Sequence, residues 1–201
     1  MFPTAEVRWF CEGPAPEEAR AWFRAVAGAP PLETRTDRYV RPVTSEGLGV
    51  KWREGKLEVK RLAEAVGEER FHVVVAGRVE RWRKWSFPLA PGASLDCPAG
   101  DWVEVEKRRR VRYFAAEPAG VRPLALGERS AEACGLELGE VRVEGRVWWS
   151  VCFEAFGSDE GALADRLRRV ASHAVAAAEP PALESARALS YPAWLRQVER
   201  A

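Results

Sequence analysis

Charged residues in this sequence recur at alternate positions of several stretches that otherwise read as β-strands. The positions concerned are Glu6, Arg8, Lys51, Arg53, Glu58, Lys60, Glu80, Lys107, Arg109, Glu137 and Glu154. Lysine and arginine side chains bind the oxygens of phosphate groups, and carboxylates bind Mg²⁺ or Mn²⁺ through oxygen. The pattern therefore indicates a site for a phosphate-rich anion, in which acidic residues hold a divalent metal.

Two arrangements of these charged faces agree with the alternation. On an open sheet the charges face water, and each cross-strand pair of opposite charge contributes about 0.2–1 kcal/mol. In a closed barrel they surround a cavity large enough for one small ligand, and they must then pair with one another, the ligand or a metal. A solvated face normally carries more Thr, Ser and Gln among its charges, whereas these polar positions are nearly all Lys, Arg or Glu.

The elements that must position these residues follow from periodicity. An alternation of period two predicts strands at residues 4–11, 34–40, 71–87 and 102–114, and hairpins at 48–62 and 136–156. The hairpin turns contain Gly55 and Gly145. Apolar residues at helical spacing predict helices at 16–27, at 159–178 with Ser158 as its cap, and at 191–198. Residues 88–100 and 115–132 read as loops.

Seven or eight strands with helices at both ends predict an α+β fold. We expect one domain over residues 1–201, an antiparallel, roughly eight-stranded barrel that is closed or nearly closed, with flanking helices. The barrel core covers about residues 4–156, and the C-terminal helices, at about 159–199, pack on it. Nine tryptophans agree with a sheet-rich fold, because aromatic residues favour half-buried strands.

Composition narrows the classes of partner. With 31 basic and 30 acidic residues the net charge is +1, which disfavours a nucleic-acid binder that relies on its overall field. The sequence has no apolar run long enough to span a membrane, and its first residues do not resemble a signal peptide, so we expect no membrane partner. The four scattered cysteines, Cys11, Cys97, Cys134 and Cys152, predict buried, reduced thiols in a cytoplasmic protein.

The order of the charged motifs resembles the CYTH superfamily, also called the triphosphate tunnel metalloenzymes. In that family an acidic–basic strand is followed by an Arg-x-Arg strand, a Glu-x-Lys strand, an acidic strand, a Lys-x-Arg strand and carboxylates on the last two strands. The matching segments here are Lys51-Trp52-Arg53, Glu58-Val59-Lys60, Glu80, Lys107-Arg108-Arg109, Glu137 and Glu154, and Asp37-Arg38-Tyr39 resembles an Asp-x-Tyr before the first basic strand. The resemblance spans about residues 4–156 and rests on order and spacing.

The resemblance implies a barrel that binds a triphosphate, a nucleoside triphosphate or a related ligand, and that hydrolyses a phosphoanhydride with Mg²⁺ or Mn²⁺. It implies phosphate binding by Arg8, Lys51, Arg53, Lys60, Lys107 and Arg109. It implies metal binding by Glu6, Glu58, Glu80, Glu137 and Glu154, and catalysis by Glu6, Lys60 and Glu154.

Two positions depart from the family pattern. Thr4 stands where the first glutamate of the opening motif is found, and Cys152 stands where many members have a second carboxylate on the last strand. Each change removes a metal ligand or a base for activating water. The sequence therefore supports anion binding more directly than metal-dependent hydrolysis.

Two alternatives to a hydrolase remain open. One is a non-catalytic barrel of the same ancestry that binds phosphate, a polyanion or RNA, since basic Arg108 to Arg112 lie near Trp102 and Tyr113. The near-zero net charge makes a nucleic-acid partner the less favoured choice. The other is an interaction domain whose charges are simply solvated.

Overall fold

The structure is a computed structural model that describes residues 1–41, 45–90 and 102–200. The strands in these ranges are β1 (Phe2–Glu12), β2 (Glu33–Val40), β3 (Leu48–Arg53), β4 (Lys56–His72), β5 (Val75–Pro88), β6 (Trp102–Glu117), β7 (Gly120–Pro123), β8 (Ala133–Val143) and β9 (Arg146–Phe156). The helices are α1 (Glu17–Ala27), α2 (Leu163–Ala177) and α3 (Tyr191–Arg200), and a short 3₁₀ helix spans Ser185–Arg187.

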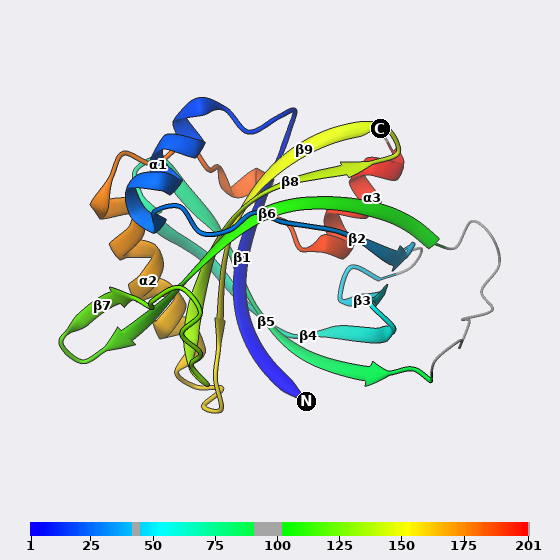
Figure 1. Ribbon diagram of the computed structural model, residues 1–201, viewed down its shortest axis with the longest axis horizontal. Coiled ribbons are helices and arrows are strands. Elements are labelled where there is room, and N and C mark those ends of the chain that lie inside the picture. Colours follow the sequence, from blue (N-terminus) through cyan, green and yellow to red (C-terminus); the bar gives the residue numbers. More distant parts are fainter. Residues whose placement is uncertain (42–44, 91–101, 201) are drawn as a thin grey trace.

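Eight strands form a closed antiparallel barrel (Figure 1). Their order around it is β2-β3-β4-β5-β1-β9-β8-β6, and the pairing of β2 with β6 completes the ring. Strand β7 pairs with β6 and lies outside the barrel. The predicted α+β fold, an antiparallel barrel of about eight strands with flanking helices, is confirmed.

Two tight turns set the register of the predicted hairpins. Glu54 and Gly55 connect β3 to β4 with φ angles of 49° and 70°, and Glu144 and Gly145 connect β8 to β9 with φ angles of 48° and 78°. Two consecutive residues with positive φ are typical of the type I′ turn, whose twist matches that of the strands it joins. These turns keep the alternating charges of each hairpin on one face.

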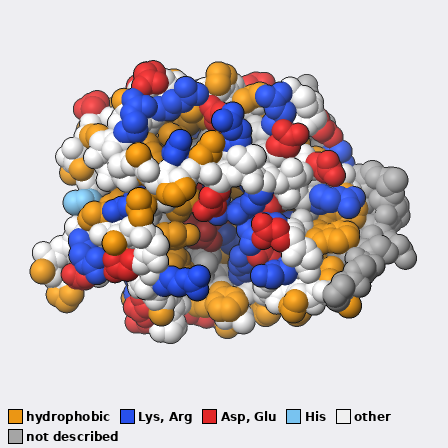
Figure 2. All heavy atoms as spheres, viewed as in Figure 1, with side chains coloured by type: hydrophobic (Ala, Val, Ile, Leu, Met, Phe, Trp, Pro, Cys, Tyr) orange, Lys and Arg blue, Asp and Glu red, His pale blue; other side chains and the backbone are white. Residues whose placement is uncertain are grey.

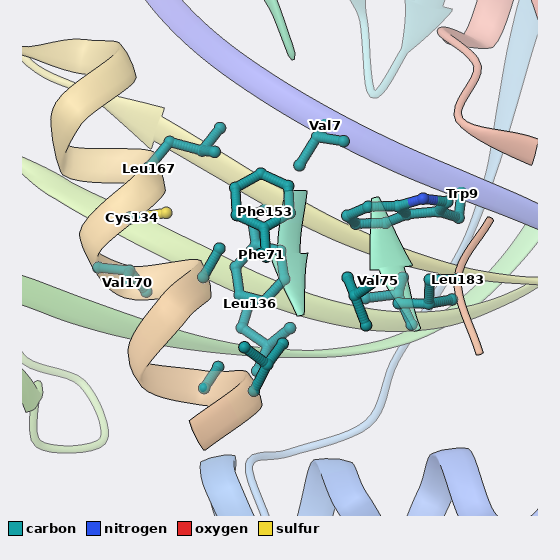
Figure 3. Close-up of a cluster of buried hydrophobic side chains, with 14 of the residues drawn as sticks. Val7, Trp9, Phe71, Val75, Cys134, Leu136, Phe153, Leu167, Val170 and Leu183 are labelled. Carbon is teal, nitrogen blue, oxygen red and sulfur yellow. The ribbon is translucent and has the colours of Figure 1, made fainter. Parts of the chain in front are cut away.

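The main hydrophobic core lies between the outer face of the barrel and the helices α1 and α2 (Figure 3). From β1, Val7 and Trp9 point into this core, where Trp9 packs edge-on against Phe71 and Phe153. A Cβ atom on Gly77 would lie 2.7 Å from the Trp9 ring, so glycine is required for this close approach. Because the apolar face of β1 is turned outward, its other face, with Glu6, is left for the barrel interior.

Helix α3 packs across one end of the barrel. Inward-facing residues at this end form a second apolar cluster with the helix, in which the rings of Phe10 and Trp194 stack at 4.4 Å and those of Tyr39 and Tyr191 at 5.2 Å. The approach is close at β3, where a Cβ atom on Gly49 would lie 3.3 Å from the Pro192 ring. This end of the barrel interior is therefore filled by side chains.

The region between residues 62 and 88 differs from its prediction. The hairpin was expected to end at Leu62, followed by a single β-rich run at 71–87, but β4 continues to His72 and β5 begins at Val75. Register shifts between Leu62 and His72 interrupt the alternation on which the prediction depended. Val73 and Val74 form the turn between β4 and β5, and both are exposed. Because they are apolar, the sequence pattern does not distinguish this turn from the strands on either side.

Two other boundaries were predicted wrongly. Residues 115–132, expected as loop, contain β7, which forms a short hairpin with the end of β6. Helix α2 begins at Leu163 rather than near 159, and Ser158 does not cap it, because the Ser158 hydroxyl donates a hydrogen bond to Glu132 instead. The Ser158 hydroxyl thus bonds to a side chain distant in the sequence and not to the first turn of α2.

Three of the four cysteines, Cys11, Cys134 and Cys152, are buried free thiols, as predicted. Cys97 and most of the predicted loop at 88–100 lie outside the described residues. Of the helices in the part of the chain that the structure describes, none is both long and apolar enough to cross a bilayer.

Candidate functional site

The barrel interior encloses a cavity of about 290 Å³ whose wall is strongly charged. Its basic lining residues are Arg8, Arg35, Lys51, Arg53, Lys60, Lys84, Lys107 and Arg109, and its acidic ones are Glu6, Glu58, Glu137 and Glu154. Figure 2 shows basic and acidic side chains together inside the hollow in the middle of the face viewed. Eight cationic groups therefore face four carboxylates across this space.

The structure brings together ten of the eleven residues that the sequence singled out, because all of them except Glu80 line this cavity. They reach it from β1, β3, β4, β6, β8 and β9, as closure of the sheet turns one face of each strand inward. Glu80, on β5, lies directly opposite Glu6 on β1. Its carboxylate accepts a hydrogen bond from the Trp82 indole at 3.1 Å.

One cluster joins the three residues that were predicted to be catalytic. The Lys60 ammonium group lies 2.5 Å from Glu6 Oε2 and 3.3 Å from Glu154 Oε1. Burial alone lowers the pKa of Lys60, but the carboxylates of Glu6 and Glu154 outweigh burial and raise it. The nearby Lys60 charge lowers the pKa of Glu154, against the effect of burial. Lys60 and Glu154 are therefore held in their charged forms.

A second cluster centres on Glu137 of β8. Its two carboxylate oxygens accept hydrogen bonds from Arg8 and Arg109, each at 2.6 Å. Burial favours the protonated acid, but the two guanidinium groups outweigh it and lower the pKa of Glu137 well below its usual range. The Arg8 guanidinium also lies 5.0 Å from the centre of the Tyr191 ring. Glu137 thus positions two arginines on the cavity wall.

A third cluster surrounds Asp37 of β2, whose side chain is fully buried. Its carboxylate lies 2.8 Å from the Lys107 ammonium group, 3.3 Å from that of Lys51 and 3.3 Å from Arg35 Nε. Burial opposes ionisation, but Lys107 and Lys51 outweigh it and lower the Asp37 pKa. Lys107 also donates a hydrogen bond to the Tyr39 hydroxyl.

A fourth cluster surrounds Glu58, which contacts Lys51 at 3.0 Å, Lys84 at 3.1 Å and Arg53 at 3.2 Å. Burial on its own raises the pKa of Glu58, but the two ammonium groups outweigh it and lower the pKa to about 2. Lys51 links this cluster to Asp37, since its ammonium group contacts both carboxylates.

Four important residues of the cavity were missing from the sequence-based set, namely Asp37, Arg35, Lys84 and Tyr191. Arg35, Asp37 and Tyr39 alternate along β2, so the rule that found the other strands also applied here. Lys84 lies opposite Lys60 in the regular part of the β4–β5 pairing and two residues from Trp82, so the alternation of β5 applied to it as well. Tyr191 comes from helix α3, and no strand pattern could have indicated it.

Comparison with known proteins assigns no family. No protein-family model matches the chain, and a search of curated proteins finds no match.

The carboxylates predicted to bind metal do not fit that role in this arrangement. Each is engaged by another side chain: Glu6 and Glu154 by Lys60, Glu137 by two arginines, Glu58 by three basic groups and Glu80 by Trp82. Within residues 1–41, 45–90 and 102–200, no three His, Cys, Asp or Glu side chains gather as a metal would require. The predicted Mg²⁺ or Mn²⁺ site is therefore not supported by the geometry.

We expect the barrel to lose stability in acid. A carboxylate whose pKa is lower in the folded protein stabilises the fold above its ordinary pKa, and this contribution disappears as the pH falls. For Glu58 the window runs from the ordinary value of 4.5 down to about 2, and the loss is on the order of 3 kcal/mol. Urea unfolding followed by tryptophan fluorescence at several pH values measures it. A free energy of unfolding that stays constant between pH 4.5 and 2 would contradict the role of these clusters.

Proposed function

We propose that the barrel interior binds a compact, phosphate-rich anion. The observation that carries this proposal is the surplus of basic side chains around one cavity, in a chain whose net charge is only +1. Eight basic residues line the cavity, against four acidic lining residues and the fully buried Asp37 that pairs with three of the basic groups. A solvated sheet face would not gather this surplus in one enclosed space. The ligand supplies the negative charge that the wall lacks.

The energetics of the free cavity support this proposal. Burial, and then the nearby charge of Lys51, lower the pKa of Lys107 well below its ordinary value. Burial also lowers the pKa of Lys51. Buried cations are costly unless opposite charges surround them, so an anion in the cavity relieves an existing penalty. We therefore expect binding of the anion to be coupled to uptake of protons by these lysines.

The types of the basic residues favour phosphate over other anions. Four of the eight are arginines, whose planar forks bind two oxygens of one phosphate group. The Nε–H groups of Arg8 and Arg53 are buried without a hydrogen-bond acceptor, and phosphate oxygens supply acceptors. A cavity of about 290 Å³ suits a small polyanion and is too small for a folded RNA.

Binding is the whole of this proposal, and turnover is not part of it. Glu6 and Glu154 were predicted to assist catalysis, but both accept hydrogen bonds from Lys60. A carboxylate that is paired in this way is a poor base for activating water.

Calorimetric titration with inorganic triphosphate tests the proposal. We expect binding that weakens as salt increases and that raises the melting temperature. Arg109→Gln should weaken binding about 10- to 100-fold, because it removes a charged hydrogen-bond donor from the cavity. Arg108→Gln is the matched control, since Arg108 lies next to Arg109 on β6 but is exposed on the outer face. No binding by the native protein, or equal losses in both variants, would refute the proposal.

A further inference from the structure

Three neighbouring strands carry a row of carboxylates into the barrel interior. Glu6 on β1 lies directly opposite Glu80 on β5 and directly opposite Glu154 on β9. Side chains at directly opposed positions of a sheet lie on the same face, with Cβ atoms about 4.5–5.5 Å apart. Burial and then the Glu6 charge raise the pKa of Glu80, which shows the mutual repulsion within the row. Such a row requires a cation.

The cation in this row is the Lys60 ammonium group. It reaches across from β4 and contacts Glu6 at 2.5 Å and Glu154 at 3.3 Å, while lying 5.6 Å from the centre of the Trp82 ring. A Mg²⁺ or Mn²⁺ ion shared by Glu6 and Glu154 would need the same space, because it binds carboxylate oxygens at about 2.0–2.4 Å. The ammonium group and a metal cannot occupy this position together.

The positions flanking the row add no further acidic ligands. Thr4 and Cys152 each precede a glutamate of the row by two residues, so they lie on the same inward face. The Thr4 hydroxyl is buried without a hydrogen-bond partner. Burial raises the pKa of the Cys152 thiol well above its ordinary value, so the thiol stays protonated. Both side chains are therefore neutral, and they supply no charge to the row, in which Lys60 contacts Glu6 and Glu154.

We propose that Lys60 permanently occupies the cation position of this carboxylate row, and that the barrel binds its anion without a divalent metal. The second part rests on the proposed function, whereas the first part concerns the protein alone. A lysine on the cavity wall supplies positive charge at every metal concentration. The affinity for the anion therefore does not depend on the concentration of Mg²⁺.

Titration with Mn²⁺, followed by the electron paramagnetic resonance signal of the free ion, tests the first part without any anion. We expect no detectable Mn²⁺ binding by the native protein. Lys60→Met leaves the carboxylates without their cation, so it should bind Mn²⁺ at least about tenfold more tightly than the detection limit set by the native protein. Lys56→Met is the matched control, because Lys56 lies on the same strand, β4, but is exposed. Its Mn²⁺ affinity should stay at the native level.

Two results overturn the first part. One is Mn²⁺ binding by the native protein that Glu6→Gln or Glu154→Gln abolishes. The other is the same absence of binding in the native protein and in folded Lys60→Met. Mn²⁺ binding by the native protein would overturn the first part even if Lys60→Met did not fold.

Calorimetric titration of inorganic triphosphate in EDTA and in Mg²⁺ tests the second part. We expect the affinity in EDTA to equal or exceed that in Mg²⁺, because free triphosphate carries more negative charge than its magnesium complex. A tenfold gain in affinity on adding Mg²⁺ overturns the metal-free inference and leaves the proposed function intact. If triphosphate binds under neither condition, the proposed function is overturned. The Mn²⁺ titration then tests the role of Lys60 independently of the anion.

Discussion

Replacing Glu137 with glutamine lowers the free energy of unfolding of the ligand-free protein by about 3–5 kcal/mol. Two arginines, Arg8 and Arg109, would then be held in the barrel wall without their shared carboxylate. The same change should tighten the binding of inorganic triphosphate, since both guanidinium groups are released for the anion. Glu137→Gln therefore separates stability from binding, and the two should move in opposite directions.

Urea unfolding with and without triphosphate measures both effects. The control is Glu106→Gln on β6, because Glu106 is exposed and its contact with Arg142 is 3.9 Å long. An exposed pair of this kind contributes little, so the control should change stability by under about 1 kcal/mol. Equal losses in the two variants would show that Glu137 is not a buried counter-ion.

Replacing Asp37 with asparagine should cost a similar amount, about 3–5 kcal/mol, because three basic groups share this one fully buried carboxylate. The double variant Asp37→Asn with Lys107→Met should recover at least half of the loss. Removing a buried pair is tolerated far better than removing one partner, since no buried charge is then left alone.

A double-mutant cycle on these two residues isolates their interaction. The four proteins are compared by urea unfolding at neutral pH, where Asp37 is ionised because its pKa is lowered. If the double variant is as unstable as Asp37→Asn alone, the ion pair with Lys107 is not the source of the loss.

The alternation of charged and apolar residues predicted which side chains share a face, and that part of the site was found. Glu6, Glu58 and Glu137 were predicted to hold metal, and all three line the cavity. Each of them contacts lysine or arginine there. Which cation a carboxylate contacts depends on distances across the barrel, and a period of two carries no information about them.

A closed or nearly closed barrel was predicted, but local patterns could not indicate which strands close it. The closing pair is β2 with β6, from Glu33 opposite Arg109 to Val40 opposite Trp102, far apart in the chain. That pairing brings Asp37 within 2.8 Å of the Lys107 ammonium group, a contact that the alternation of residues along β2 cannot indicate.

Helix α3 fills one end of the barrel, and this has a consequence for any elongated ligand. If the barrel binds an elongated phosphate chain as proposed, the chain would enter end first and leave by the same opening. Its leading group would stop near Tyr191 and Lys107, whose ammonium group lies 3.9 Å from the centre of the Tyr191 ring. The depth of the cavity would then limit the length of the chain that fits inside, and a longer chain would protrude.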